Sequence, residues 1–396
     1  MSTGLPRELL DIIIDDLRTD GPSLRACALS FRAMVPFAQS RLFYKVVLGH
    51  AQKSLESVTQ RTPCEKLSRL LESSPHLASF IRDLRIVDND PRLDPWVLSE
   101  ARTLSRILPL FDLKRISVRC KREALDWDKM HRELKTSLLR IFASPRLEAI
   151  QLHGLLLSAP PECPLFHVFK DSQPNLQHLS FSYRLRDKRR RSLSPPPVWA
   201  PKLCSLVIDA DYAVDLLDGF SSAAMDYSRL RTLILSGFSF SEMNKVLYAM
   251  KDRNVLEHLS IVDSGSENTS EANLDGLRFL TNLRTIRYRL YLVFEFMTLL
   301  GHLAANAPLE KIVFEVFVHN AVYNSISDWT ALALATKALS KPVKVLLGEY
   351  GVRDPRPGRL AFCLNECFER SKEALATSSR LTITEATSYV PLSEMW

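Results

Sequence analysis

The sequence predicts an α/β fold in which a small N-terminal helical module precedes a solenoid of stacked repeats. Two patterns and one bulk property predict it. An apolar pattern recurs about every 27 residues through most of the 396-residue chain, whereas residues 5–48 follow a helical period. With 46% hydrophobic residues, the chain is too apolar for disorder and long enough for a sizeable core. We therefore expect a three-helix module followed by an irregular array of about nine or ten repeats.

The repeated pattern is an apolar residue, a second three positions later and a third two beyond that. It is clearest in Ser228–Ser236, where Leu230, Leu233 and Leu235 fit it. The other copies are Ile81/Leu84/Ile86, Leu113/Ile116/Val118, Leu147/Ile150/Leu152, Leu176/Leu179/Phe181, Leu203/Leu206/Ile208, Leu256/Leu259/Ile261, Leu283/Ile286/Tyr288 and Leu309/Ile312/Phe314. Their first residues lie 32, 34, 29, 27, 27, 26, 27 and 26 apart. This period and motif are typical of leucine-rich repeats, in which each unit needs its neighbours to bury its strand.

The N-terminal residues read as three short helices and a strand. The first helix starts at Pro6, and Asp20-Gly21-Pro22 ends it; Ser23 is the expected N-cap of the second, and Pro36 opens a third at Phe37–Phe43. Tyr44–Leu48 then reads as a strand. The apolar face of the first helix is too wide for so small a module to cover. Its leftover surface should contact a partner or the solenoid.

This segment resembles an F-box, in the form found in large fungal F-box families. The family's opening Leu-Pro-x-Glu-Leu is matched at Leu5, Pro6, Glu8 and Leu9; its later positions are matched at Ile13, Leu17, Leu24, Cys27, Leu29, Arg32, Arg41, Leu42 and Phe43. Met34 stands where the family often has Trp, which predicts looser packing. Leu70–Ile86 also resembles the segment that joins box to repeats in those proteins.

The resemblance implies a substrate receptor for a cullin–RING ubiquitin ligase, which binds the Skp adaptor through the box and a protein substrate through the repeats. Such a receptor raises the effective concentration of a substrate lysine and does no chemistry itself. The implied adaptor contacts are Leu5, Pro6, Leu9, Ile13, Leu17, Leu24 and Leu29, each of which could instead be core of the box. The alternatives are a repeat scaffold without ligase function and a nucleic-acid binder.

The predicted domains are residues 1–48 (F-box-like), 49–76 (helical linker), 77–350 (solenoid) and 351–396 (capping helix and loose tail). A helix at Trp329–Leu339, capped by Ser327-Asp328, precedes a tenth strand at Val343–Leu347. Arg359–Leu375 should form the last helix, and the final twenty residues carry little pattern.

Within each predicted strand, residues between the inward apolar ones face away from the core. In leucine-rich repeats this second face binds partners. Its centre is small and polar here, and its ends are basic. The candidate substrate-binding residues are Arg115, Arg119, His153, Arg287, Arg289, Lys311 and Glu315. The guanidinium groups suit an acidic or phosphorylated segment, although a solvated face without a partner would have the same composition.

Tyr183–Val198 interrupts the repeats with a basic, proline-rich stretch. It is interpreted as a solvated loop, with a nuclear-import signal or phosphorylation at Ser192 or Ser194 as the functional alternatives. Nucleic-acid binding through residues 184–191 is a weaker alternative, because no aromatic residues are interleaved with the charges.

Other classes of function lack support in the sequence. The seven cysteines form no C-x-x-C pair, and no phosphate loop, nucleophile elbow or zinc-protease motif occurs. We expect no catalysis, metal or cofactor. The N-terminus lacks a secretory core, and the most apolar window, Tyr291–Ala307, contains Glu295 and His302 and is too short to cross a bilayer. The predicted location is cytoplasmic or nuclear, away from membranes.

Overall fold

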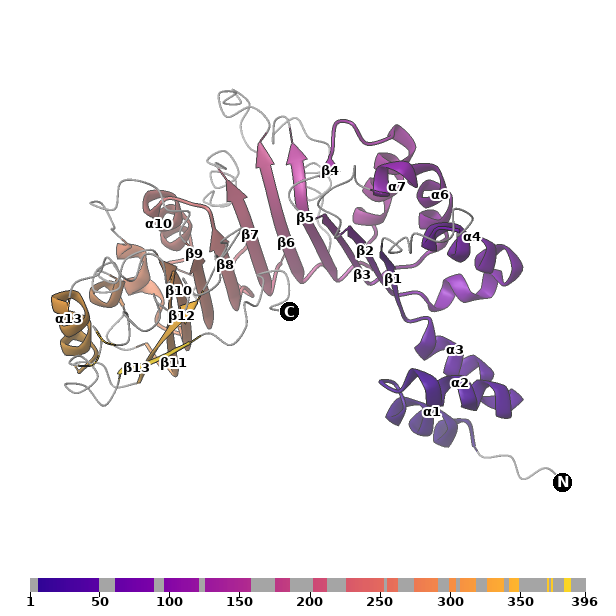
Figure 1. Ribbon diagram of the computed structural model, residues 1–396, viewed down its shortest axis with the longest axis horizontal. Helices are drawn as coiled ribbons and strands as arrows, with labels where there is room; N and C mark the ends of the chain where they lie inside the picture. Colours follow the sequence, from indigo (N-terminus) through magenta and orange to yellow (C-terminus); the bar gives the residue numbers. More distant parts are fainter. Residues whose placement is uncertain are drawn as a thin grey trace. The chain divides into compact units, whose positions relative to one another are not determined.

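The structure is a computed structural model (Figure 1). The structure describes residues 6–49, 61–88, 96–120, 125–157, 175–185, 202–211, 226–252, 255–262, 274–290, 299–303, 307–317, 326–337, 342–348, 369, 372 and 381–385. The chain forms two compact units, one of residues 1–157 and 173–176, the other of residues 158–172 and 177–396. Both units are mixed α/β, and their strands pair in parallel without closing into a barrel.

The first unit begins with the helices α1 (Arg7–Asp16), α2 (Gly21–Ser30) and α3 (Val35–Leu42), with the 3₁₀ turn η1 (Arg32–Met34) between the last two. Helix α1 begins at Arg7, so Pro6 is its N-cap and not its first residue as predicted, and Pro36 lies in the first turn of α3. The predicted cap of α2 is wrong: Asp20 is the N-cap, and its carboxylate accepts a hydrogen bond from the backbone N–H of Ser23, at 3.2 Å. A proline tolerates the first turn because its missing N–H has no partner there anyway.

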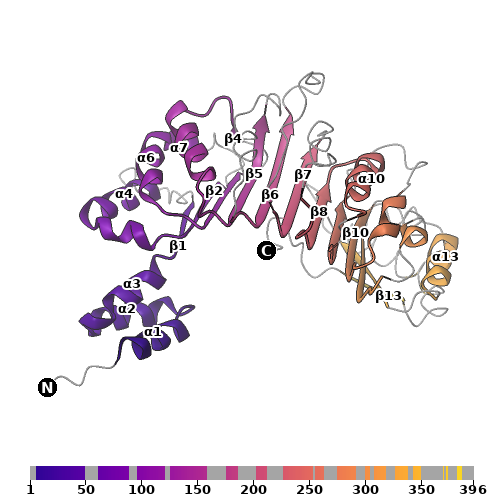
Figure 2. The same cartoon turned by 180° about the vertical axis from the view of Figure 1, so that it is seen from behind.

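The rest of the first unit alternates strands with short helical connections. Its elements are β1 (Lys45–Gly49), α4 (Pro63–Ser73), η2 (Pro75–Phe80), β2 (Asp83–Asp88), α5 (Trp96–Ser99), α6 (Ala101–Ile107), η3 (Leu108–Leu110), β3 (Arg115–Cys120), β4 (Leu125–Asp126), α7 (Arg132–Phe142) and β5 (Ala149–Leu157). The strands lie in the order β1-β2-β3-β5, and β4 pairs with the far end of β5. Helix α4 contacts α6, which contacts α7, so the helices stack beside the strands (Figures 1 and 2).

The second unit repeats this plan. Its elements are β6 (His178–Leu185), β7 (Ser205–Asp211), β8 (Thr232–Ser236), α10 (Phe240–Ala249), β9 (His258–Val262), η6 (Asp275–Phe279), β10 (Thr285–Leu290), β11 (Lys311–Phe317), α13 (Ile326–Lys337), β12 (Val343–Gly348) and β13 (Leu381–Glu385). From β6 to β13 each strand pairs with the next one along the chain, always in parallel. The predicted helix after Ser327 and the predicted tenth strand are α13 and β12.

The apolar residues of the predicted pattern line up across the strands. In the second unit, the middle positions form the row Leu179–Leu206–Leu233–Leu259–Ile286–Ile312–Val343–Leu381, and the third positions form Phe181–Ile208–Leu235–Ile261–Tyr288–Phe314–Val345–Ile383. Every member of both rows is buried. This in-register stacking gives an α/β solenoid-like fold whose core lies on the helix side of the strands.

Two predicted boundaries need correction. Strand β1, assigned to the N-terminal module, pairs with β2, so the sheet starts before residue 77. The final twenty residues, predicted to carry little pattern, include β13, which pairs with β12. The alternation of apolar and polar residues in Leu-Thr-Ile-Thr-Glu indicates this strand. Of the predicted helix Arg359–Leu375 only Glu369 and Lys372 are described, both helical, and residues 186–198 of the basic stretch lie outside the described residues. None of the described helices is both long and apolar enough to cross a membrane.

Candidate partner-binding surfaces

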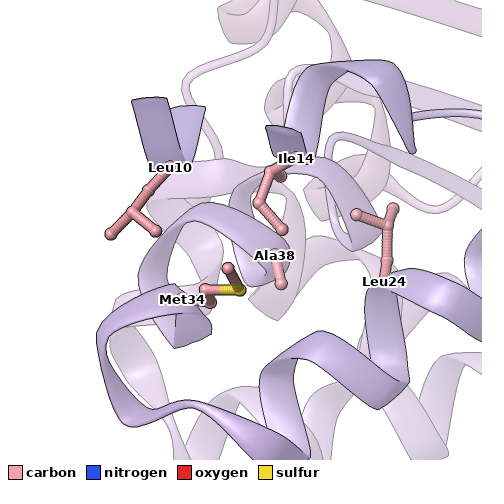
Figure 3. Close-up of a cluster of buried hydrophobic side chains, with 5 residues drawn as sticks. All are labelled: Leu10, Ile14, Leu24, Met34 and Ala38. Atoms are coloured by element: carbon pink, nitrogen blue, oxygen red, sulfur yellow. The ribbon is translucent and has the colours of Figure 1, made fainter. Parts of the chain in front are cut away.

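The three N-terminal helices enclose a small core of their own. Its buried side chains come from all three helices and from η1: Leu10, Ile14, Leu24, Met34 and Ala38. Figure 3 shows them gathered around Ala38. Met34, expected to loosen the module, instead fills its interior, since an unbranched side chain adapts to an irregular gap.

Ionic and aromatic contacts fix α1 against α3. Arg41 of α3 places its Nη2 3.2 Å from Asp15 Oδ1 and 3.5 Å from Asp11 Oδ1, both on α1. The guanidinium of Arg7 lies 5.4 Å from the ring centre of Phe37, close enough for a cation–π contact. These contacts join α1 to α3, while Leu10 and Ile14 of α1 face the core and other apolar side chains of α1 face solvent.

The outward stripe leaves large apolar side chains uncovered. On α1, Ile12 is 58% exposed, and Leu9 and Ile13 are also exposed; at the end of α2, Leu29 is 89% and Phe31 is 60% exposed. Exposed apolar residues are ordinary when scattered, but these five belong to one module of fewer than forty residues. The module therefore presents two groups of exposed apolar side chains, Leu9, Ile12 and Ile13 on α1 and Leu29 and Phe31 at the end of α2, as candidate docking residues; we call the five together the box surface.

The predicted adaptor contacts divide between this surface and the core. Leu9, Ile13 and Leu29 lie on the box surface, and Pro6 is exposed at the start of α1. Leu24 is 1% exposed and packs inside the module, so its assignment as a contact residue is replaced by a packing role. Leu17 is half-buried against the same core, and Leu5 lies outside the described residues. Ile12 and Phe31 were missed, although the apolar run around Ile12 signalled a surplus of apolar side chains.

In the first unit, the predicted substrate-binding residues on the second face differ in their exposure to solvent. Arg115 is exposed, whereas Arg119 is partly buried and donates from Nη2 to Gln151 Oε1 at 3.0 Å. His153 lies opposite Arg119 in the β3–β5 ladder and is buried. Burial, and then the nearby Arg119 charge, lower the pKa of His153 to about 4. This imidazole is therefore neutral near pH 7, and its burial leaves little of it accessible for the substrate contact that the sequence suggested.

In the second unit, the expected cationic patch is an internal ion-pair cluster. Arg287 and Arg289 of β10 both donate to the carboxylate of Glu315 on β11, from their Nε atoms at 2.5 and 2.8 Å. Arg289 and Glu315 are almost completely buried, and Lys311 is exposed. Two guanidinium groups on one buried carboxylate form a structural cluster, because leaving any one charge unpaired in the interior would be costly. Only Arg287 and Lys311 of this predicted set keep exposed surface.

The centre of the second face is less polar than expected. Val207 of β7 and Ile234 of β8 lie side by side in register and form a small apolar cluster, with Val262 of β9 packed against it. The sequence signal was available, since two apolar residues occupy the same position in adjacent repeats. We call Val207, Ile234 and Val262 the second-face cluster.

Metal-ligating side chains do not cluster in the part of the chain that the structure describes. No group of three or more His, Cys, Asp or Glu residues there could hold a metal ion. Comparison of the chain with models of known protein families and with characterised proteins gives no match. Residues and geometry alone therefore carry the functional argument.

Proposed function

We propose that the chain is the substrate-recognition subunit of an SCF-type cullin–RING ubiquitin ligase. Its N-terminal helices would be an F-box that binds the Skp adaptor, and its strands and helices a leucine-rich-repeat solenoid that holds a protein substrate. The observation that carries the proposal is the box surface. The module already has a filled five-residue core, and it still exposes Leu29, Phe31 and Ile12. Large apolar side chains exposed in this way support a protein partner that covers them.

The repeat rows support the second half of the proposal. Each unit of the predicted pattern supplies one parallel strand, and its apolar residues stack on those of its neighbours. This is the arrangement that a leucine-rich repeat needs, and recognition would use the second face of the strands. Arg115 in one unit, and Lys311 in the other, are exposed cations on that face.

The test is binding of the purified chain to a fungal Skp adaptor, measured by calorimetry. Replacing Ile12 and Ile13 together by Asp should weaken binding by at least about 30-fold, since each truncated interface anchor costs about 1–2 kcal/mol. Both side chains point outward, so the far-ultraviolet circular dichroism should not change. The matched control is Leu110→Asp, which charges an equally exposed leucine outside the module and should bind normally.

A deletion provides the second arm. It should remove residues 1–43 and not 1–48, because residues 45–49 form β1 and pair with β2. Loss of binding on deletion supports the adaptor role. A folded chain that fails to bind the adaptor before any change would refute the ligase function and favour a leucine-rich scaffold that recruits partners by itself.

A further inference from the structure

The second face of the first unit carries an excess of positive charge. Its residues form three rows across β1, β2, β3 and β5: Lys45–Asp83–Arg115–Ala149, Val47–Arg85–Ser117–Gln151 and Gly49–Val87–Arg119–His153. Within these rows Lys45 and three arginines are cationic, and only Asp83 is anionic. The positive charge is therefore concentrated on one face of four neighbouring strands.

Two of the cations lack a compensating carboxylate. Asp83 is held by Arg85, whose Nη2 lies 3.3 Å from its Oδ2. Lys45 and Arg115 are exposed, and neither forms an ion pair with a carboxylate in the part of the chain that the structure describes. The carboxylates closest to the starts of β3 and β5 along the chain already have partners: Asp112 pairs with Arg82 and Arg146, and Glu148 pairs with Lys114.

Ser117 lies at the centre of this face with an unused hydroxyl group. Its side chain points away from the core, because Ile116 and Val118 on either side of it are buried in the core. Ser117 is 4% exposed, and its Oγ has no hydrogen-bond partner among the described residues. A buried hydroxyl without an acceptor is unfavourable, so an oxygen atom of a ligand would supply a missing interaction.

The neighbours of Ser117 explain its burial and leave a way in. Eight residues surround it in the rows, namely Asp83, Arg85, Val87, Arg115, Arg119, Ala149, Gln151 and His153. The arginines and Gln151 have much longer side chains than serine, so they stand over it. Arg115 is itself exposed and forms no ion pair with a described carboxylate, so its flexible side chain can move aside and admit a ligand to the hydroxyl group.

The spacing of the two unpaired cations fits separate carboxylates better than one phosphate. Lys45 and Arg115 lie in one row with β2 between them, so their Cα atoms are about 10 Å apart at roughly 4.8 Å per strand. In an extended peptide, side chains two positions apart point the same way and stand about 7 Å apart, within reach of both long cations. A phosphate concentrates its charge on one group, which both cations would reach only above the Asp83 carboxylate.

We propose that this face binds an extended acidic segment of a protein through two Asp or Glu residues two positions apart. One carboxylate pairs with Lys45, and the other accepts hydrogen bonds from the guanidinium of Arg115 and from Ser117 Oγ. The three rows contain no Phe, Tyr or Trp on which a base could stack, so nucleic acid is a poorer fit. The inference rests on the proposed function in one respect, namely that the acidic segment belongs to the substrate.

The first experiment selects ligands without knowledge of the natural partner. A phage-displayed library of random short peptides is panned on the full chain and counter-selected on the double variant Lys45→Gln/Arg115→Gln. The recovered peptides should contain two acidic residues two positions apart. Recovery of peptides without acidic residues, or no recovery after counter-selection, would overturn the proposal.

Fluorescence anisotropy with one recovered peptide then measures each contact. Lys45→Gln and Arg115→Gln should each weaken binding by about 10-fold, because each variant removes a charge-assisted hydrogen bond. The matched control Arg102→Gln removes another exposed arginine, on α6, and should bind normally. A single-stranded RNA oligonucleotide that binds more tightly than the peptide would contradict the assigned ligand. So would a peptide that binds only when phosphoserine replaces its acidic residues.

Ser117→Ala separates a binding role from a folding role. It should weaken peptide binding by about five-fold. It should not lower the melting temperature, because the hydroxyl group has no hydrogen bond to lose. Unchanged binding of either Ser117→Ala or Arg115→Gln would refute the assigned contacts.

These measurements use no adaptor, so the two proposals fail separately. A chain that binds the Skp adaptor but no acidic peptide would refute this inference alone. A chain that binds the acidic peptide but not the adaptor would refute the ligase function alone.

Discussion

Acid sensitivity from His153 is the most direct energetic consequence of the structure. The pKa of this buried imidazole is lowered to about 4 by burial and by Arg119, from an ordinary value of 6.5. The folded state therefore disfavours the proton that the unfolded state accepts. Stability from this group is complete above pH 6.5 and is lost as the pH falls toward 4.

The two pKa values set the magnitude. By linkage, the contribution of His153 to the free energy of unfolding falls by about 2 kcal/mol between pH 7.5 and pH 5. The total loss is about 3 kcal/mol when the pH falls below 4. The measurement is urea unfolding followed by circular dichroism at pH 7.5 and pH 5. The variant His153→Gln, which cannot take up a proton there, should lose about 2 kcal/mol less than the unaltered chain over the same interval.

Comparing the unaltered chain with the His153→Gln variant removes the contribution of every other titrating group to the pH dependence. Asp112, whose pKa is lowered by its hydrogen bonds and ion pairs with Arg82 and Arg146 against an opposing effect of burial, loses its stabilising contribution mainly below pH 4. The variant His76→Gln removes an exposed histidine and controls for the substitution itself. Equal pH dependence of the unaltered chain and His153→Gln would refute the buried, neutral state of this side chain.

Further predictions concern packing, backbone and thiols. Leu233→Ala should cost about 2–5 kcal/mol in urea unfolding, because Leu233 is fully buried in the middle row of the core; a loss below about 1 kcal/mol would contradict that packing. Gly154→Ala should cost at least about 3 kcal/mol, since its φ of +76° is left-handed and a Cβ would overlap the Cys120 carbonyl group. Gly301→Ala, where the new Cβ meets nothing within 4 Å in a helical segment, should instead leave the stability unchanged to within about 1 kcal/mol and is the matched control. Cys64 and Cys120, whose pKa burial raises to about 12, should resist maleimide at pH 8 until the chain is unfolded; rapid labelling of the folded chain, counted by mass spectrometry, would show that they are accessible.

The repeats could be predicted because their signal is local and recurs. Leu230, Leu233 and Leu235 show the same spacing as the other eight copies, and stacking in register follows from one period and one strand per copy. The helices of the N-terminal module were similarly readable from Pro6, Pro36 and an apolar period. Strand β13 escaped prediction because it lies outside the copies of the pattern, and Asp20 was overlooked as a cap because the following Gly-Pro resembled a helix stop.

Which side chains remain available to a partner was decided only by tertiary structure. Leu24 and Leu29 share a helix and an apolar character, yet the neighbouring α1 and α3 cover the first and leave the second exposed. On β10, Arg289 is buried because Glu315 of the next strand neutralises it, a pairing between residues 26 positions apart. The sequence alone determined the period of the chain, and hence the strands that carry the repeated pattern and their order, since periodicity reflects local geometry. Exposure and charge pairing depend on which distant segments meet, so they emerged only when the chain was folded.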